Sequence, residues 1–126
     1  MPRQFNFSET VKRDARLRQM ELCAYCGDSL NEQWEEAHHV VPDQSGQKGI
    51  HADDWMKSAS NCVVLCDPCH ANVGHDGNTK TGSVAGPEVY KYSHGGDHVQ
   101  HAEWVRLLDI QAAKIWGSKL GRSSLT

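Results

Sequence analysis

The chain has 126 residues, of which 38% are hydrophobic and 23% charged, with a formal net charge of −3 at pH 7. This length suits one domain with one modest core, and the composition argues against a disordered chain. No apolar run is long enough for a membrane span, and the N-terminus lacks the apolar stretch of a secretory signal, so we expect no membrane anchor and a location in the cytoplasm, or export that needs no signal peptide.

The first predicted element is a helix from about Glu9 to Leu22. Ser8 suits its N-cap, and apolar residues recur at helical spacing. Residues 1–20 hold five basic residues against two acids, although the whole chain is acidic. Arg13 and Arg16 are therefore candidates for contacts to nucleic-acid phosphates. Ordinary solvated charge explains each of them equally well when it is taken singly.

The sequence contains two Cys-x-x-Cys pairs, Cys23 with Cys26 and Cys66 with Cys69. Each tight turn presents two sulfurs, and two such turns complete the tetrahedral four-thiolate site that is typical of structural Zn²⁺. A redox pair is the alternative, but the surrounding βαβ pattern of such proteins is absent. Zinc at a closed site of this kind contributes directly to folding. The fifth cysteine, Cys62, is expected to be a buried apolar residue.

Two short strands are predicted at about Glu35 to Val41 and Cys62 to Leu65, with one helical turn capped by Asp53 between them. His38 and His39 are neighbours on the first strand. Since alternate residues of a strand face opposite sides, one of these histidines can bind a metal ion while the other faces a substrate.

A short helix from about Pro68 is predicted to carry His70, and a long glycine-rich loop follows over residues 76–97. Asp97 suits the N-cap of the last helix, which the apolar periodicity predicts from about His98 to Trp116. If the first strand packs on the short helix, His70 can face His38.

The order of these pieces resembles the HNH endonuclease family, also called the His-Me finger or ββα-metal family. The segment AHHVVP, then Asn61 opening NCVVLC, then CDPCH with His70 are similar to the strand, loop, strand and helix of that family. The resemblance covers roughly residues 22–76. It implies an α+β fold over 1–126 as a single domain, in which a small ββα-metal finger with a four-cysteine zinc knuckle is flanked by N-terminal and C-terminal helices, the latter over about 98–116.

The resemblance also implies a role for each matching residue. His39 would be the general base that takes a proton from the attacking water, and Asn61 would hold the loop and orient His39. His38 and His70 would bind one divalent ion that stabilises the phosphate and the leaving 3′ oxygen. Many relatives have a second helix histidine four residues after the first, where this chain has glycine. We expect the next residue, His75, to reach the metal, with a phosphate contact as the alternative.

The function implied by the resemblance is a metal-dependent endonuclease that hydrolyses the phosphodiester bonds of DNA with little sequence specificity, because no further base-reading module is visible. RNA stays open as a substrate. The cofactors would be a structural Zn²⁺ and a catalytic divalent cation, with Mg²⁺ favoured and Mn²⁺, Ni²⁺ or Zn²⁺ also acceptable to such ligands. His94 in the glycine-rich loop is a further candidate for a nucleic-acid contact.

Two questions about the biological role follow from this resemblance. The AHH triplet is similar to one branch of bacterial toxin nucleases, and the small size favours an antibacterial toxin or effector domain with a cognate immunity protein as partner. Restriction and phage nucleases are the alternatives within the enzyme class. The alternative from another class is a non-catalytic zinc module that binds a nucleic acid or a protein, and such a module would have no use for His39.

Overall fold

The computed structural model describes residues 7–31, 34–41, 53–71 and 86–116. Over these ranges the protein is a small mixed α+β fold built on a two-stranded antiparallel sheet, as predicted. The longer elements are α1 (Glu9–Arg18), β1 (Glu35–His39), β2 (Cys62–Cys66) and α5 (His98–Trp116). Single turns are α3 (Asp53–Met56), η1 (Ala59–Asn61), α4 (Asp67–Cys69) and η3 (Pro87–Val89). None of the helices within these ranges is long and apolar enough to cross a membrane.

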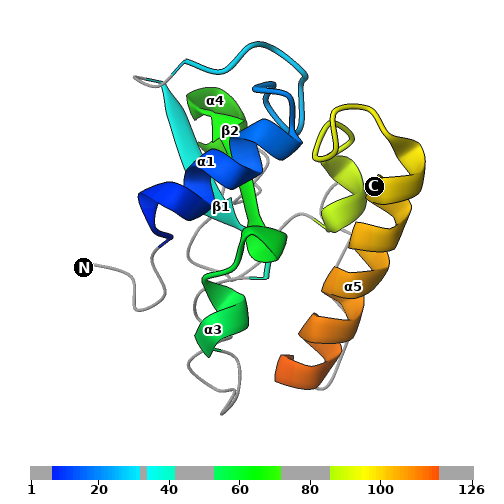
Figure 1. Ribbon diagram of the computed structural model, residues 1–126. Coiled ribbons are helices and arrows are strands. Elements are labelled where there is room, and N and C mark those ends of the chain that lie inside the picture. The colour runs from blue at the N-terminus through cyan, green and yellow to red at the C-terminus, as the bar shows by residue number, and fades with distance from the viewer. Residues whose placement is uncertain (1–6, 32–33, 42–52, 72–85, 117–126) are drawn as a thin grey trace.

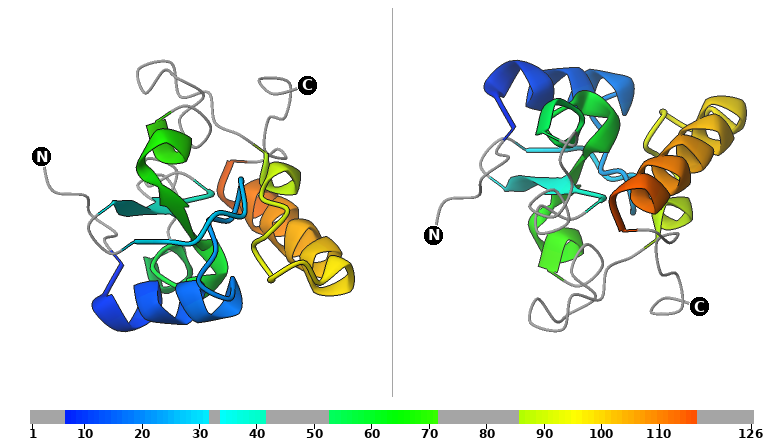
Figure 2. Two further views of the ribbon diagram at one scale, coloured as in Figure 1. Left: turned by 90° about the horizontal axis from the view of Figure 1, so that it is seen from above. Right: turned by 90° about the horizontal axis from the view of Figure 1, so that it is seen from below.

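The sheet has helices packed on both of its faces. In Figure 1 α1 crosses in front of the strands and α5 runs beside them. The views from above and below in Figure 2 agree that α1 and α4 lie on opposite sides of the sheet. Each strand therefore has one face toward α1 and one toward α4 and α5.

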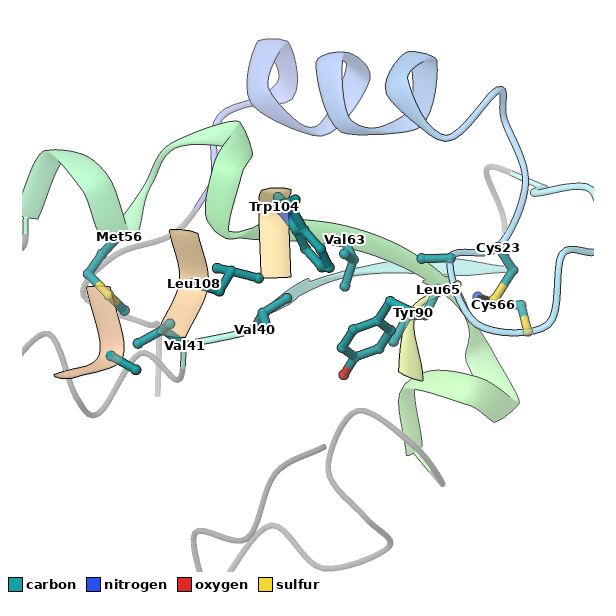
Figure 3. Close-up of a cluster of buried hydrophobic side chains, with 12 residues drawn as sticks. Cys23, Val40, Val41, Met56, Val63, Leu65, Cys66, Tyr90, Trp104 and Leu108 are labelled. Atoms are coloured by element: carbon teal, nitrogen blue, oxygen red, sulfur yellow. Dashed lines mark hydrogen bonds between the residues drawn. The ribbon is translucent and has the colours of Figure 1, made fainter. Parts of the chain in front are cut away.

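Strand register and alternation sort the side chains between these two faces. β1 pairs with β2 so that His38 lies opposite Val63 and His39 opposite Cys62. Two apolar clusters form as a result. The smaller one, on the α1 face, contains Phe7, Ala15, Cys62 and Val64. The larger one, on the other face, is drawn in Figure 3 and includes Val63, Leu65, Tyr90, Trp104, Leu108 and Ala112.

The helix α1 begins as predicted but ends four residues earlier. The Ser8 hydroxyl accepts the backbone N–H of Val11 at 3.2 Å and so caps the first turn. Beyond Arg18, both Met20 and Glu21 have positive φ angles, 56° and 58°. Non-glycine residues in this left-handed region end a helix, so the chain turns here toward the first cysteine pair.

The other elements lie close to their predicted positions. α5 has the predicted bounds, and the Asp97 carboxylate accepts the N–H groups of Val99 and Gln100 at 3.1 and 3.0 Å, which is the expected cap. β1 ends two residues before Val41, and β2 extends one residue further, to Cys66. Of the predicted glycine-rich loop, residues 76–85 lie outside the described ranges, while the remainder contains η3 and a series of turns.

Candidate functional site

The four cysteines of the two pairs come together in one cluster. Their Sγ atoms all lie within 4.8 Å of one another, and those of Cys26 and Cys66 are 4.0 Å apart. None of them forms a disulfide. Tetrahedral zinc with Zn–S bonds of about 2.3 Å places its sulfurs about 3.8 Å apart, so small adjustments complete the coordination. The predicted set of Cys23, Cys26, Cys66 and Cys69 could therefore hold a structural metal ion such as zinc.

The first cysteine turn depends on Gly27 and on a tyrosine from a distant segment. Gly27 has φ +79° and donates its N–H to the Cys23 carbonyl at 2.9 Å. A Cβ at this position would also lie 2.9 Å from the Tyr92 ring. The Tyr92 N–H in turn donates to the Ala24 carbonyl at 2.8 Å. The turn is thus closed locally by Gly27 and tied to the segment before α5.

The second cysteine turn is the junction of β2 and α4. Cys66 is the last residue of the strand and the N-cap of the helix, with extended backbone angles. Pro68 lies in the first helical turn, where its fixed φ fits and its missing N–H costs nothing. Cys69 follows within the same turn, and His70 comes directly after it as the C-cap residue.

Without a cation, not all of these thiols ionise at neutral pH. Burial raises the pKa of Cys23, but backbone N–H donors from Cys26, Cys66 and Tyr25 outweigh it, so the net effect lowers that pKa. One of these donors is the Cys66 N–H, which lies 3.5 Å from the Cys23 Sγ atom that accepts it. Burial and the neighbouring Cys23 sulfur raise the pKa of Cys26 to about 11. Burial and the adjacent cysteines also raise the pKa of Cys69. A divalent ion supplies the positive charge that the remaining thiolates need.

Cys62 lies apart from this cluster. It is fully buried on the α1 face of the sheet, in the smaller apolar cluster. Burial raises the pKa of its thiol to about 12, so the group stays protonated at neutral pH. This confirms the prediction of a buried apolar role.

His38 and His70 lie side by side on the face of the sheet away from α1. Their ring centroids are 5.4 Å apart with an interplanar angle of 71°, and His38 is only 2% exposed. Two imidazoles in this arrangement can share one divalent ion. His75, the expected third ligand, lies outside the described residues. Within the described ranges, only the cysteine cluster unites three or more close metal-ligating side chains.

His39 points to the opposite face, as the strand alternation predicted. Its ring stacks on Phe7 at a centroid distance of 4.0 Å and an angle of 20°, and the residue is 3% exposed. Phe7 immediately precedes the N-cap of α1, so the start of that helix positions the histidine. Stacking occupies a face of the ring, whereas proton transfer uses the nitrogen lone pair in the ring plane.

Asn61 holds the backbone just beyond His39. Its side-chain Oδ1 accepts the Val41 N–H at 2.7 Å, and its Nδ2 donates to the carbonyls of Val41 and Met56 at 3.0 and 3.2 Å. Its own carbonyl accepts the Val40 N–H at 3.1 Å. The fully buried amide thus joins the end of β1 to α3. Through these bonds it is placed to orient His39 by way of the backbone.

A cleft of about 690 Å³ lies between α1 and the α1 face of β1. Arg13 and Arg16 both line it. Arg16 is half-buried, and its guanidinium lies 3.3 Å from a carboxylate oxygen of Glu35 and 3.4 Å from one of Glu21. Arg13 is exposed. Of the two predicted phosphate contacts, Arg16 is therefore engaged in ion pairs within the protein, and Arg13 is the more accessible.

His94 belongs to a polar cluster beside Trp104. The Ser93 hydroxyl oxygen lies 3.1 Å from His94 Nδ1 and 3.0 Å from His101 Nδ1, and both rings pack on Trp104. Burial, Arg18 and His101 lower the pKa of His94 to about 4. A neutral His94 can contact a phosphate only as a hydrogen-bond donor, not as a cation.

Two structurally important residues were not predicted. Arg18 donates to the carbonyls of Ser93, Ala59 and Cys62 at 2.9, 2.7 and 2.6 Å, and its guanidinium lies over the Trp104 ring. The buried Gln19 amide pairs with both backbone groups of Val64, at 2.8 and 2.9 Å. Nothing in the sequence distinguishes Arg18 from the exposed arginines of the same helix.

Tyr90 was also missed, and it lies next to His38. Their ring centroids are 6.2 Å apart, and Tyr90 is fully buried. Burial, with a smaller contribution from Cys23, raises the pKa of Tyr90, so its hydroxyl keeps its proton at neutral pH. In the sequence, Tyr90 is an aromatic residue within a glycine-rich region, and nothing there indicates that it lies beside His38.

Comparison of the chain with protein-family models, with curated proteins and with solved structures finds no match.

Proposed function

We propose that this protein is an HNH-type, metal-dependent endonuclease that hydrolyses the phosphodiester bonds of DNA with little sequence specificity. The observation that carries the proposal is the approach of His38 and His70, whose rings come from β1 and from the end of α4 to within 5.4 Å. These segments are far apart in the chain, and His70 directly follows a cysteine of the four-cysteine cluster. The arrangement supports a ββα-metal finger as the core of the fold.

In the proposed mechanism His38 and His70 hold a divalent cation, with Mg²⁺ favoured. When bound, such a cation stabilises negative charge on the phosphate and on the leaving oxygen. His39 takes a proton from water as the water oxygen bonds to phosphorus. The bond from phosphorus to the 3′ oxygen breaks, which leaves a 3′ hydroxyl after protonation and a 5′ phosphate.

The residues around this pair support the assigned roles. Asn61 fixes the chain directly after His39, and Phe7 restrains the ring. Because His38 and His39 are consecutive residues near the end of β1, a phosphodiester must lie across the strand to contact both. Arg13, exposed at the cleft under α1, is on the same face as His39 and can contact a neighbouring phosphate.

The biological setting that we propose is an antibacterial effector domain with an immunity protein as partner. It rests on the small size of the nuclease core and on the AHH triplet alone. A non-catalytic zinc module is the competing function, since the cysteine cluster by itself would serve one equally well.

Plasmid cleavage by the purified, zinc-loaded protein tests the nuclease. We expect nicking and linearisation with added Mg²⁺ or Mn²⁺, no cleavage with EDTA, and loss of cleavage in His39→Ala. His98→Ala is the matched control, because His98 is an exposed histidine at the start of α5. A folded wild type that cleaves neither DNA nor RNA with either metal would instead identify a binding module.

A further inference from the structure

The Tyr90 hydroxyl is a buried polar group that the surrounding apolar cluster does not explain. Tyr90 is 0% exposed and packs among the residues of the larger cluster. Within the described part of the chain, its hydroxyl oxygen has no hydrogen-bond partner. Most buried polar side-chain atoms do have a partner, and an unpaired hydroxyl destabilises the fold. Phenylalanine would fill the same space without this cost, so the oxygen calls for another explanation.

The surroundings of this oxygen are those of the histidine pair. The Tyr90 ring lies 6.2 Å from the His38 ring, which itself lies 5.4 Å from His70. Figure 3 shows the ring on the side of the sheet away from α1, with its oxygen pointing away from Leu65 and Cys66. The ring nitrogens of His38 are as buried as the hydroxyl. A species that binds His38 would therefore lie in buried surroundings beside the Tyr90 ring.

The backbone and neighbours of Tyr90 hold it firmly in this place. Its N–H donates to the Pro87 carbonyl at 3.2 Å at the end of η3, and its ring packs edge-on against Trp104 at 6.4 Å. The side chain needs no ordering when a ligand arrives. A donor held in advance stabilises developing charge more effectively than a mobile one.

We propose that Tyr90 is a further residue of the His38 and His70 site, whose hydroxyl donates a hydrogen bond to the oxygen bound to the metal. That oxygen would come from water in the resting protein and from the phosphate in the substrate complex. A charged phosphate oxygen is a strong acceptor for a phenol. Two histidines leave most coordination positions of a divalent ion to such oxygens. The proposal rests on the proposed nuclease function and adds a residue to its site.

The test compares Tyr90→Phe with Tyr92→Phe in the full, zinc-loaded chain. Tyr92 is 37% exposed and lies at the first cysteine turn, so its variant also removes one hydroxyl but not from the histidine site. Three readouts are needed: the melting temperature, the affinity for Mn²⁺ by titration calorimetry, and kcat and KM for plasmid cleavage.

We expect Tyr90→Phe to keep its zinc and its melting temperature, or to gain in melting temperature. Its kcat should fall on the order of 100-fold with little change in KM, as on removal of a donor that acts in the transition state. Its Mn²⁺ affinity should fall as well. Tyr92→Phe should match the wild type in all three readouts.

Two results would overturn the proposal while the nuclease function stands: wild-type cleavage by Tyr90→Phe, or a fall in its melting temperature, which would reveal a structural partner for the hydroxyl. If the wild type itself cleaves nothing, the proposed nuclease function is wrong. The Mn²⁺ affinity then tests whether Tyr90 belongs to the metal site. A weaker affinity in Tyr90→Phe alone then supports its place in the metal site, and equal affinities reject it.

Discussion

At the scale of single residues, buried polar side chains complete the hydrogen bonds that a two-stranded sheet leaves open. Gln19 pairs with both backbone groups of Val64, and Asn61 does the same for Val41. Arg18 serves three carbonyls from two separate segments, that of Ser93 and that of Ala59 and Cys62. Backbone groups buried without a partner are costly, and this small fold has few strands to supply partners. Single polar residues therefore contribute to the stability of this fold by pairing these backbone groups.

Replacing Arg18 tests this dependence. Arg18→Met leaves three partly buried carbonyls without their donor, so we expect the free energy of unfolding to fall by about 2 to 4 kcal/mol. Urea denaturation measures the change. Arg13→Met, an exposed arginine of the same helix, should change the stability by no more than about 0.5 kcal/mol. Equal effects of the two substitutions would show that the carbonyl contacts of Arg18 contribute little.

The pH dependence of stability should report on His94. Burial and the neighbouring Arg18 and His101 lower its pKa in the folded protein from 6.5 to about 4. Between these values the unfolded chain binds a proton that the folded protein does not, so stability falls as the pH decreases through this window. We expect His94→Gln to lose less stability than the wild type between pH 7 and pH 5, as measured by urea denaturation. Acid release of a metal from the cysteines would affect both proteins alike, so only the difference between them reports on His94. Equal losses of stability in both proteins would contradict the assigned pKa shift.

At the scale of elements, the two cysteine turns show how local geometry and a distant contact act together. The second turn is local, since the end of β2 and the Pro68 helix start place Cys66 and Cys69 by themselves. The first turn needs both a left-handed Gly27 and the Tyr92 segment that packs against it. Any side chain at position 27 should therefore disturb the turn in two ways, through backbone strain and through contact with the Tyr92 ring.

Alanine substitution at two glycines separates these two effects. Gly96 has φ +89° with open space around it, so Gly96→Ala introduces only the backbone strain of about 1 to 2 kcal/mol. Gly27→Ala adds a contact of 2.9 Å with the Tyr92 ring. We expect it to lower the melting temperature further and to release zinc to a competing chelator more readily. If both variants behave alike, backbone strain alone explains the requirement for glycine at position 27.

At the scale of the whole molecule, the cysteine cluster joins parts of the chain that are far apart in sequence. It links the turn after α1 to the junction of β2 and α4, and Tyr92 ties the same region to the segment before α5. A chain of this size buries a modest core, so a metal ion bound at this point would contribute to folding as well as to local shape.

Metal removal should therefore unfold much of the protein. We expect one tightly bound zinc per chain, and loss of both the zinc and the cooperative thermal transition in Cys69→Ser. Cys62→Ala should keep the zinc, because Cys62 lies in the apolar cluster on the other face. Metal analysis and circular dichroism of the two variants make the comparison. A Cys69→Ser protein with an unchanged transition would show that the cluster is dispensable for the fold.

The sequence by itself determined the features that depend on neighbouring residues. The two Cys-x-x-Cys turns, the Ser8 and Asp97 caps, the α5 bounds and the opposite faces of His38 and His39 all follow from local spacing, and the structure has them. A cap or an alternation is decided within a few residues, so the chain pattern carries it.

Only the tertiary structure decided which polar side chains are buried and what they contact. Arg16 and Arg18 are two residues apart on one helix, yet one pairs with carboxylates at a cleft and the other enters the interior. The early end of α1, the approach of His38 to His70 and the burial of Tyr90 depend likewise on segments distant in the chain. Burial is a property of the packed whole, because the partners that make a buried charge or hydroxyl tolerable come from elements that the local sequence does not specify.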